Sequence, residues 1–360
     1  MTLNHLKLIN EAHKIAKKNF GKTFPNPVVG CIIAKKNTII SRGVTSNSGR
    51  PHAEEIAIKK AGKRAKGSTM YVTLEPCFHN SSNGSCTDQI LRAGIKKIYI
   101  SSVDPDIRTK NKSIKKLKDN KVVVIEGLES EKTYLLNKFF FTSLKKQRPF
   151  IKVKMAISSD EKIAWHNYQS KWISNSKSRK LAHIIRSKSQ AILTTAKTII
   201  KDDPRFTIRL QGKIDHLNII IIDNFLKIPI KSKILQDIKK RIIIFTSNKK
   251  SKKIIKLQNL GCEVILIKKN KLGNLNLNTI VKKIYNLKIS DVLVEAGGIF
   301  FSSLVKSNLI DELHIFQSNF SIGEKGIPVL IDKKIHDLKT NLLEKRKIDN
   351  NYYYKYNFFN

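Results

Sequence analysis

Two short motifs on either side of one predicted strand constrain the fold of this chain more than any other feature. His52 and Glu54 stand where a helix is predicted to begin, and Cys77 and Cys86 follow the apolar run Met70–Leu74, a predicted strand. An imidazole and two thiols can bind one metal ion only if the start of that helix and the end of that strand lie close together. The motifs therefore predict an α/β arrangement with a metal site at one end of the sheet.

The residue types point to zinc. A catalytic zinc ion takes nitrogen and sulfur ligands from three residues and leaves a fourth position for water. His52, Cys77 and Cys86 supply such a set, and Glu54 beside them could move protons. His-x-Glu followed by Pro-Cys-x-x-Cys is the signature of zinc nucleobase deaminases, although eight residues rather than two separate the cysteines here. Each residue alone is ordinary, as a capping histidine, a buried cysteine or a solvated acid, but together they favour the zinc site.

Strands that alternate with helices predict a three-layer α/β/α domain in the first part of the chain. A helix is predicted over residues 3–19, and strands are predicted over 28–34, 38–43, 70–74, 97–103 and 122–126. Further helices are predicted over 55–60, from 113 onward and over 131–144. Pro76 predicts one more helix, which would place Cys77 at its N-terminus. The stretch Lys145–Pro149 is typical of a linker, so we expect one domain over residues 1–146 and another over 147–360.

The second part of the chain predicts another α/β domain. Strands are predicted over 150–155, 191–193, 218–223, 241–246, 263–268, 291–295 and 312–316, with a terminal strand within 350–360. Helices are predicted over 175–187, 251–259 and 277–287. After Glu295, Gly297 and Gly298 lead into a predicted helix, where backbone N–H groups can approach a phosphate closely. A tight strand-to-helix turn would explain the same glycines nearly as well.

The formal net charge of +41 comes mostly from lysines scattered over every exposed segment. Because no stripe of basic residues with interleaved aromatics gathers this charge, a general surface bias is favoured over a nucleic-acid groove, and no specific nucleic acid is expected as a partner. Four cysteines do not make a disulfide scaffold. No apolar run approaches the length of a membrane span, and the N-terminus lacks the pattern of a secretion signal. We therefore expect a cytoplasmic protein without a membrane partner.

The first domain resembles the deaminase half of a bifunctional riboflavin-biosynthesis family, the diaminohydroxyphosphoribosylaminopyrimidine deaminase / 5-amino-6-(5-phosphoribosylamino)uracil reductases. Residues 25–31, 51–54 and 71–77 carry the resemblance, and the eight-residue gap between the cysteines is the spacing of this family. The resemblance implies a cytidine-deaminase-like fold. The implied site residues are His52, Cys77 and Cys86 as zinc ligands, Glu54 as the catalytic proton shuttle, and Asn26 as a contact to the pyrimidine.

The second domain resembles the reductase half of the same family, which has a dihydrofolate-reductase-like fold. Residues 154–156, 170–174, 202–204 and 294–298 carry this resemblance. The implied NADPH contacts are Ala156, Trp172, Thr198, Asp202, Gly297 and Gly298. The implied contacts to a phosphorylated substrate are Ser170, Arg186, Phe206, Arg209 and Glu295. Of these, the two arginines are the natural phosphate ligands, because a guanidinium binds phosphate through two parallel hydrogen bonds. The family also implies a homo-oligomer.

The resemblance covers nearly the whole chain and implies two consecutive steps of riboflavin biosynthesis. The first is zinc-dependent hydrolytic deamination of 2,5-diamino-6-(5-phosphoribosylamino)pyrimidin-4-one, and the second is NADPH-dependent reduction of the ribosyl group to ribityl. Two alternatives stay open. The loops 78–85 and 106–112 depart from the family pattern, which would fit a reductase that carries an inactive deaminase scaffold. The high positive charge would fit a zinc deaminase that acts on RNA.

Overall fold

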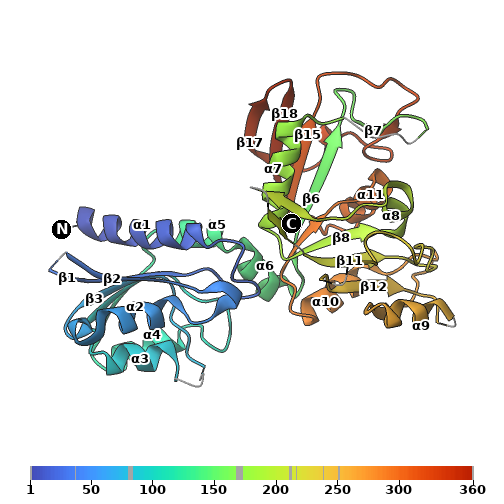
Figure 1. The fold of residues 1–360 in the computed structure, drawn as a ribbon. Helices are drawn as coiled ribbons and strands as arrows, with labels where there is room; N and C mark the ends of the chain where they lie inside the picture. Colours follow the sequence, from blue (N-terminus) through green and yellow to red (C-terminus); the bar gives the residue numbers. More distant parts are fainter. Residues whose placement is uncertain are drawn as a thin grey trace. The chain divides into compact units, whose positions relative to one another are not determined.

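A computed structural model describes residues 2–36, 38–79, 84–167, 173–210, 213–215, 217–237, 239–249 and 252–358. The chain divides into two units, Met1–Gln147 and Arg148–Asn360, and Figure 1 shows the elements of each. Each unit has its own sheet and its own hydrophobic core. Among the described helices, none has both the length and the apolar character that crossing a bilayer requires.

The first unit is a five-stranded sheet with helices on both faces. Its helices and strands are α1 (Thr2–Lys18), β1 (Gly30–Lys35), β2 (Thr38–Val44), α2 (Ala53–Ala61), β3 (Thr69–Leu74), α3 (Cys86–Arg92), β4 (Lys97–Ser102), α4 (Lys112–Asp119), β5 (Val123–Glu126), α5 (Ser130–Leu136) and α6 (Lys138–Lys146), with 3₁₀ turns at Asn47–Gly49 and Gly62–Ala65. The strand order is β2-β1-β3-β4-β5. Strand β1 is antiparallel to β2 and β3, whereas β3, β4 and β5 run parallel.

The three layers of this unit follow from the apolar patterns of its elements. Helices α1 and α5 pack on one face of the sheet, and α2, α3 and α4 cover the other (Figure 1). Ile9 and Ala12, in the apolar stripe of α1, are fully buried and belong to one core cluster with Ile32 and Tyr71. A Cβ at Gly30 would lie 2.0 Å from the Ala12 carbonyl oxygen, so glycine lets α1 close onto β1. The predicted α/β fold class is confirmed for this unit.

Two predicted helices of the first unit were wrong. No helix begins at Pro76, because the Cys77 carbonyl instead accepts hydrogen bonds from the Thr87 backbone N–H and hydroxyl, at 3.3 and 2.9 Å. The helix predicted over 131–144 is two helices, α5 and α6, which are separated at Asn137. The buried Asn137 side chain accepts from Val28 N–H and donates to Val28 O, at 2.8 and 3.1 Å, and this long-range pairing ties down the break.

The second unit is built on a nine-stranded sheet. Its helices and strands are β6 (Phe150–Ile157), β7 (Lys162–Ala164), α7 (Ser176–Ser187), β8 (Ala191–Thr195), α8 (Ala196–Asp202), β9 (Ile208–Leu210), β10 (Lys213–Asp215), β11 (Asn218–Ile222), β12 (Ile242–Thr246), α9 (Lys252–Asn259), β13 (Glu263–Leu266), α10 (Leu277–Asn286), β14 (Asp291–Val294), α11 (Gly298–Lys306), β15 (Glu312–Gln317), β16 (Ile327–Pro328), β17 (Thr340–Ile348) and β18 (Asn351–Phe358), with a 3₁₀ turn at Ile335–Asp337.

Because seven strands of this sheet run parallel, their carboxyl ends lie at the same edge. The strands follow each other as β13-β12-β11-β8-β14-β6-β15-β18-β17. All pairs from β13 to β15 are parallel, and β18 and β17 complete the sheet in antiparallel pairing. Strands β9 and β10 form a separate two-stranded ladder. The predicted terminal strand is β18, and the predicted α/β class is confirmed for this unit too.

The stretch that was predicted to be a linker is largely structured. Helix α6 continues through Lys146, and Arg148 is buried in the second unit. Its guanidinium forms two hydrogen bonds with the Asp311 carboxylate, at 2.6 and 2.8 Å, and Asp311 also accepts from Ile151 N–H. Because the partner lies 163 residues away, the sequence around Arg148 contains no local sign of this burial.

Candidate active sites

Three side chains that can bind a metal meet at one end of the first sheet. His52 is the N-cap of α2, at the start of the predicted helix, and Cys86 is the first residue of α3. Cys77 follows the end of β3. The ligand atoms of the three residues all lie within 4.8 Å of one another. One imidazole and two thiols are the donor set of a catalytic zinc site, so these residues fit a zinc ion.

The carboxyl group of Glu54 is buried beside this cluster, in the first turn of α2. Burial raises the pKa of Glu54 to about 7, although the neighbouring His52 and a hydrogen bond with Cys86 oppose the rise. The Cys77 thiol behaves in the opposite way, because hydrogen bonds from Cys86 and His52 lower its pKa to about 4 against the effect of burial. The arrangement places a buried carboxyl group, which can hold or release a proton, beside the three side chains that can bind a metal.

A second buried carboxylate, Glu75, holds the loop next to the cluster. It accepts hydrogen bonds from Asp104 N–H at 3.1 Å, Asn111 N–H at 3.1 Å and Ser113 Oγ at 2.7 Å. Thr109, in the same loop, lies with its hydroxyl oxygen 3.4 Å from the backbone nitrogen of Phe78, which donates to it. The two segments that depart from the family pattern, 78–85 and 106–112, therefore touch each other through Phe78 and Thr109.

Asn26, the predicted pyrimidine contact, is held by the loop that precedes His52. Its Nδ2 donates to the Gly49 carbonyl oxygen at 3.2 Å. Gly49 has a φ of +88°, and a Cβ there would lie 2.2 Å from Asn26 Nδ2. Only glycine is therefore compatible with this backbone and this neighbour. Gly49 is a supporting residue that the sequence analysis missed, because nothing near it in the sequence reveals the contact with Asn26.

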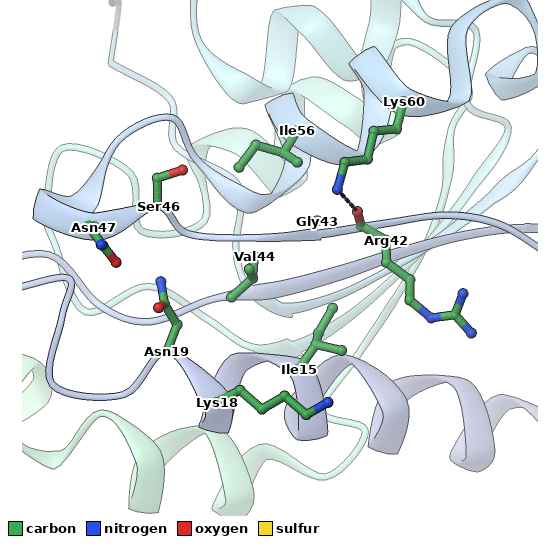
Figure 2. A pocket seen from close by; sticks show the side chains of 10 residues that line it. All are labelled: Ile15, Lys18, Asn19, Arg42, Gly43, Val44, Ser46, Asn47, Ile56 and Lys60. Atoms are coloured by element: carbon green, nitrogen blue, oxygen red, sulfur yellow. Dashed lines mark hydrogen bonds between the residues drawn. The ribbon is translucent and has the colours of Figure 1, made fainter. Parts of the chain in front are cut away.

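A separate depression of about 680 Å³ lies beside the edge strand β2. Figure 2 shows Lys18 of α1, Arg42 of β2 and Lys60 of α2 around it, with Lys60 Nζ donating to Arg42 O at 3.3 Å. None of the predicted site residues that the structure describes lines this depression, so it is distinct from the metal cluster.

The second unit has a cavity of about 1300 Å³ that includes the carboxyl ends of several parallel strands. Ligands of α/β proteins bind at this edge of a parallel sheet. Nine of the predicted contact residues line the cavity: Ala156, Arg186, Thr198, Asp202, Phe206, Arg209, Glu295, Gly297 and Gly298. The other two, Ser170 and Trp172, lie outside the described residues.

Glu295, directly after β14, lies at the centre of a buried cluster of charges. Arg186 Nε and Nη2 donate to its two carboxylate oxygens at 2.8 and 3.0 Å, and Lys154 Nζ lies 3.3 Å from Oε2. Burial alone would raise the pKa of Glu295, but Lys154 and Arg186 outweigh it and lower the pKa to about 2. The cluster therefore holds an ionised carboxylate between two cations at the wall of the cavity.

Lys154 is a site residue that the sequence analysis did not select. It lies inside β6, a strand whose other residues are mostly buried, and it lines the cavity. A cation inside a buried strand is costly unless it is paired, so the pattern Phe-Ile-Lys-Val-Lys-Met over 150–155 was the available signal.

The two predicted phosphate ligands have different surroundings. The Arg186 guanidinium is bound to Glu295, donates to the Thr207 carbonyl oxygen at 2.5 Å and lies 5.9 Å from the centre of the Phe206 ring. Arg209 is exposed at the cavity, and within the described residues its side chain pairs with no carboxylate. Of the two, Arg209 is therefore the one whose guanidinium is open to a ligand.

The two glycines at the start of α11 serve different purposes. A Cβ at Gly298 would lie 2.6 Å from the Val329 carbonyl oxygen, so this glycine is required by the packing of the unit itself. A Cβ at Gly297, the N-cap of α11, would meet nothing within 4 Å. The space beside Gly297 belongs to the cavity, so a phosphate group could approach the backbone there.

Comparisons with known families define the class of each unit. Residues 3–102 match the family described as the cytidine and deoxycytidylate deaminase zinc-binding region. Residues 149–354 match the RibD C-terminal domain. The chain therefore joins a domain of the zinc-binding deaminase class to a RibD C-terminal domain.

Relatives that span both units define the family. The riboflavin biosynthesis protein RibD of Aquifex aeolicus is 36% identical over 348 residues, which cover 96% of this chain and 95% of the relative. That of Escherichia coli is 30% identical over 85% of each chain. The structure of Acinetobacter baumannii RibD superposes with a TM-score of 0.91 at 27% identity, over 100% of both chains. The Thermotoga maritima diaminohydroxyphosphoribosylaminopyrimidine deaminase/5-amino-6-(5-phosphoribosylamino)uracil reductase superposes with a TM-score of 0.86 at 30% identity, over 99% of both chains.

This chain belongs to the RibD family of bifunctional riboflavin-biosynthesis enzymes. The predicted combination of a deamination followed by a reduction is confirmed by these relatives and by the two matched domains.

Proposed function

We propose that residues 1–146 form a zinc-dependent deaminase and residues 147–360 an NADPH-dependent reductase. The first acts on 2,5-diamino-6-(5-phosphoribosylamino)pyrimidin-4-one, and the second reduces the ribosyl group of the deaminated product to ribityl. The observation that carries the proposal is the convergence of His52, Cys77 and Cys86 to within 4.8 Å beside the buried Glu54, in a chain that also has the cavity around Glu295.

In the deaminase, His52, Cys77 and Cys86 would hold the zinc ion. A zinc ion bound in this way makes hydroxide available near neutral pH. Glu54 takes the proton of the attacking water and delivers it to the departing amine. Asn26, fixed by its hydrogen bond to Gly49 O, orients the pyrimidine ring. The reaction is a hydrolysis, so each turnover consumes one water molecule and releases one ammonia.

In the reductase, the cavity would hold NADPH and the phosphorylated substrate side by side. NADPH supplies the hydride that reduces C1′. Ala156, Thr198, Asp202 and the Gly297–Gly298 turn form the cofactor side, to which we also assign Trp172. On the substrate side, Ser170, Phe206 and Glu295 contact the substrate, and Arg209 binds its phosphate.

Arg186 and Lys154 both pair with Glu295, and we assign a separate role to each. Arg186 holds Glu295 and Thr207 in place as well as facing the cavity. Reduction at C1′ also needs a proton, and the Lys154 ammonium, held by Glu295 at 3.3 Å, is a proton donor at this wall.

Zinc content and ammonia release test the deaminase assignment. Cys86→Ser should lose bound zinc, as measured by atomic emission. Glu54→Gln should keep the zinc and lose ammonia release by at least the factor of about 100 that a general acid–base contributes. Glu55→Gln, in the same helical turn but outside the cluster, is the matched control. Wild-type ammonia release by Glu54→Gln would contradict the role of Glu54, and a wild-type enzyme that releases no ammonia would fit the inactive-scaffold alternative.

The deaminated substrate tests the reductase assignment separately. When 5-amino-6-(5-phosphoribosylamino)uracil is supplied, NADPH oxidation should proceed in Glu54→Gln as in the wild type. It should fall strongly in Lys154→Met, which removes the ammonium but keeps an extended side chain. If Lys154→Met oxidises NADPH at the wild-type rate, the proton-donor role is wrong.

We further propose that the enzyme works in the cytoplasm as a homo-oligomer. All four cysteines are buried and free, which suits a reducing compartment. Cell fractionation and light scattering of the purified protein measure these two properties directly.

A further inference from the structure

The strand that carries Arg209 is not held by the main sheet of the second unit. Within the part of the chain that the structure describes, β9 pairs with β10 alone in a two-stranded ladder, whereas Lys154 lies on a strand of the nine-stranded sheet and Glu295 directly follows one. The position of Arg209 relative to Glu295 therefore depends on contacts other than the ladder of that sheet.

Helix α7 supplies two of these contacts. Arg186 Nη1 donates to the Thr207 carbonyl oxygen at 2.5 Å, and His183 Nδ1 accepts the backbone N–H of Arg209 at 3.3 Å. The two helical residues are three apart, which is about 4.5 Å along a helix, and the two strand residues are two apart, which is about 6.6 Å along a strand. One face of α7 can therefore bind two points of the extended segment that contains Arg209.

His183 can accept this hydrogen bond only as a neutral ring with an unprotonated Nδ1. Its surroundings favour that form. Burial and the neighbouring Arg186, Arg209 and Lys154 lower the pKa of His183 to about 4, against the opposing charge of Glu295. The ring is thus an acceptor, not a cation, when the enzyme works near neutral pH.

We propose that His183 is a positioning residue, which fixes the backbone of Arg209 and thereby aims its guanidinium at the substrate phosphate. This inference rests on the proposed role of Arg209 in the reductase. His183 does not line the cavity, so its effect on the reaction passes through Arg209. It should therefore set the affinity for the phosphorylated substrate and leave the hydride transfer step nearly unchanged.

The test measures KM and kcat of the reductase with 5-amino-6-(5-phosphoribosylamino)uracil, and the dissociation constant of NADPH from fluorescence titration. Loss of one backbone hydrogen bond should raise KM about fivefold in His183→Ala, with kcat and the NADPH dissociation constant within twofold of wild type. His183→Asn, whose Oδ1 can accept in place of Nδ1, should restore most of the affinity. Lys180→Ala, an exposed residue one turn earlier on α7, is the matched control and should behave as wild type.

A double variant distinguishes the positioning role of His183 from the proposed role of Arg209 in phosphate binding. Arg209→Gln should raise KM strongly, and adding His183→Ala to it should change KM no further, because the group that His183 positions is gone. If Arg209→Gln leaves KM unchanged, the proposed role of Arg209 fails. If Arg209→Gln raises KM but His183→Ala matches Lys180→Ala, or the two effects multiply in the double variant, the positioning role of His183 is contradicted. A fall in kcat as large as the rise in KM would also contradict it.

Discussion

The ion-pair cluster around Glu295 allows a quantitative prediction. Glutamine has nearly the shape of a protonated glutamic acid, so Glu295→Gln removes the charge and little else. The pKa of Glu295 falls from an ordinary value of 4.5 to about 2 in the folded protein. Since a change of one unit in pKa corresponds to about 1.4 kcal/mol, the ionised form contributes about 3 kcal/mol to the free energy of unfolding. The variant should lose about that much, because Lys154 and Arg186 then lie beside an uncharged partner.

The pH dependence of this loss has a definite sign. The folded pKa is depressed, so the stabilisation is fully present above pH 4.5 and disappears as the pH falls toward 2. The difference between wild type and Glu295→Gln should be constant from pH 8 to pH 5 and should shrink below that.

Denaturant titration followed by tryptophan fluorescence reports the unfolding of the second unit, which contains Glu295. Both tryptophans of the chain, Trp165 and Trp172, belong to the second unit. Glu263→Gln is the matched control, because the Glu263 carboxylate also binds an arginine, Arg241, at 2.6 and 3.1 Å, but the two side chains are 44% and 39% exposed. An exposed pair contributes about 0–1 kcal/mol. If Glu295→Gln loses no more stability than Glu263→Gln, the account of the Glu295 cluster is refuted.

Three further predictions concern backbone and support positions. Gly298→Ala should destabilise the second unit by about 1–3 kcal/mol, because its Cβ would press on the Val329 carbonyl oxygen. Gly297→Ala should leave the stability unchanged and should weaken NADPH binding in a fluorescence titration. Gly49→Ala should lower the melting temperature of the first unit and reduce the kcat/KM for ammonia release, since the new Cβ would displace Asn26; normal kinetics would contradict the support role of Gly49. Asn137→Ala should cost about 2–3 kcal/mol in calorimetry of the first unit, because it leaves the backbone N–H of a buried residue without its partner, and a loss below 0.5 kcal/mol would be inconsistent with the pairing described.

The sequence was sufficient for the parts of the fold that depend on local pattern. Helix α1, strands β1 and β2 and the strands β6, β8, β11, β12, β13, β14 and β15 of the second unit lie close to where apolar spacing predicts them. The metal cluster was also predictable, because the chemistry of zinc requires its ligand types and the motif places them at the ends of neighbouring elements.

The features that the sequence analysis missed depend on partners far away in the chain. The break at Asn137 is tied to Val28, and Arg148 is buried because Asp311 neutralises it. Neither interaction changes the local pattern of residue types, so a helix and a linker were the natural predictions. The sequence around Lys154 does contain a signal, a lysine inside an apolar strand, but the place of Lys154 in the site is defined by Glu295, which follows a different strand.

A single time course shows whether this one chain performs both reactions. Purified enzyme receives 2,5-diamino-6-(5-phosphoribosylamino)pyrimidin-4-one and NADPH, and ammonia release and NADPH oxidation are recorded together. We expect ammonia to appear first, NADPH oxidation to follow after a lag, and the two to reach equal amounts. NADPH oxidation without ammonia, or ammonia release with no NADPH oxidation after it, would contradict the account.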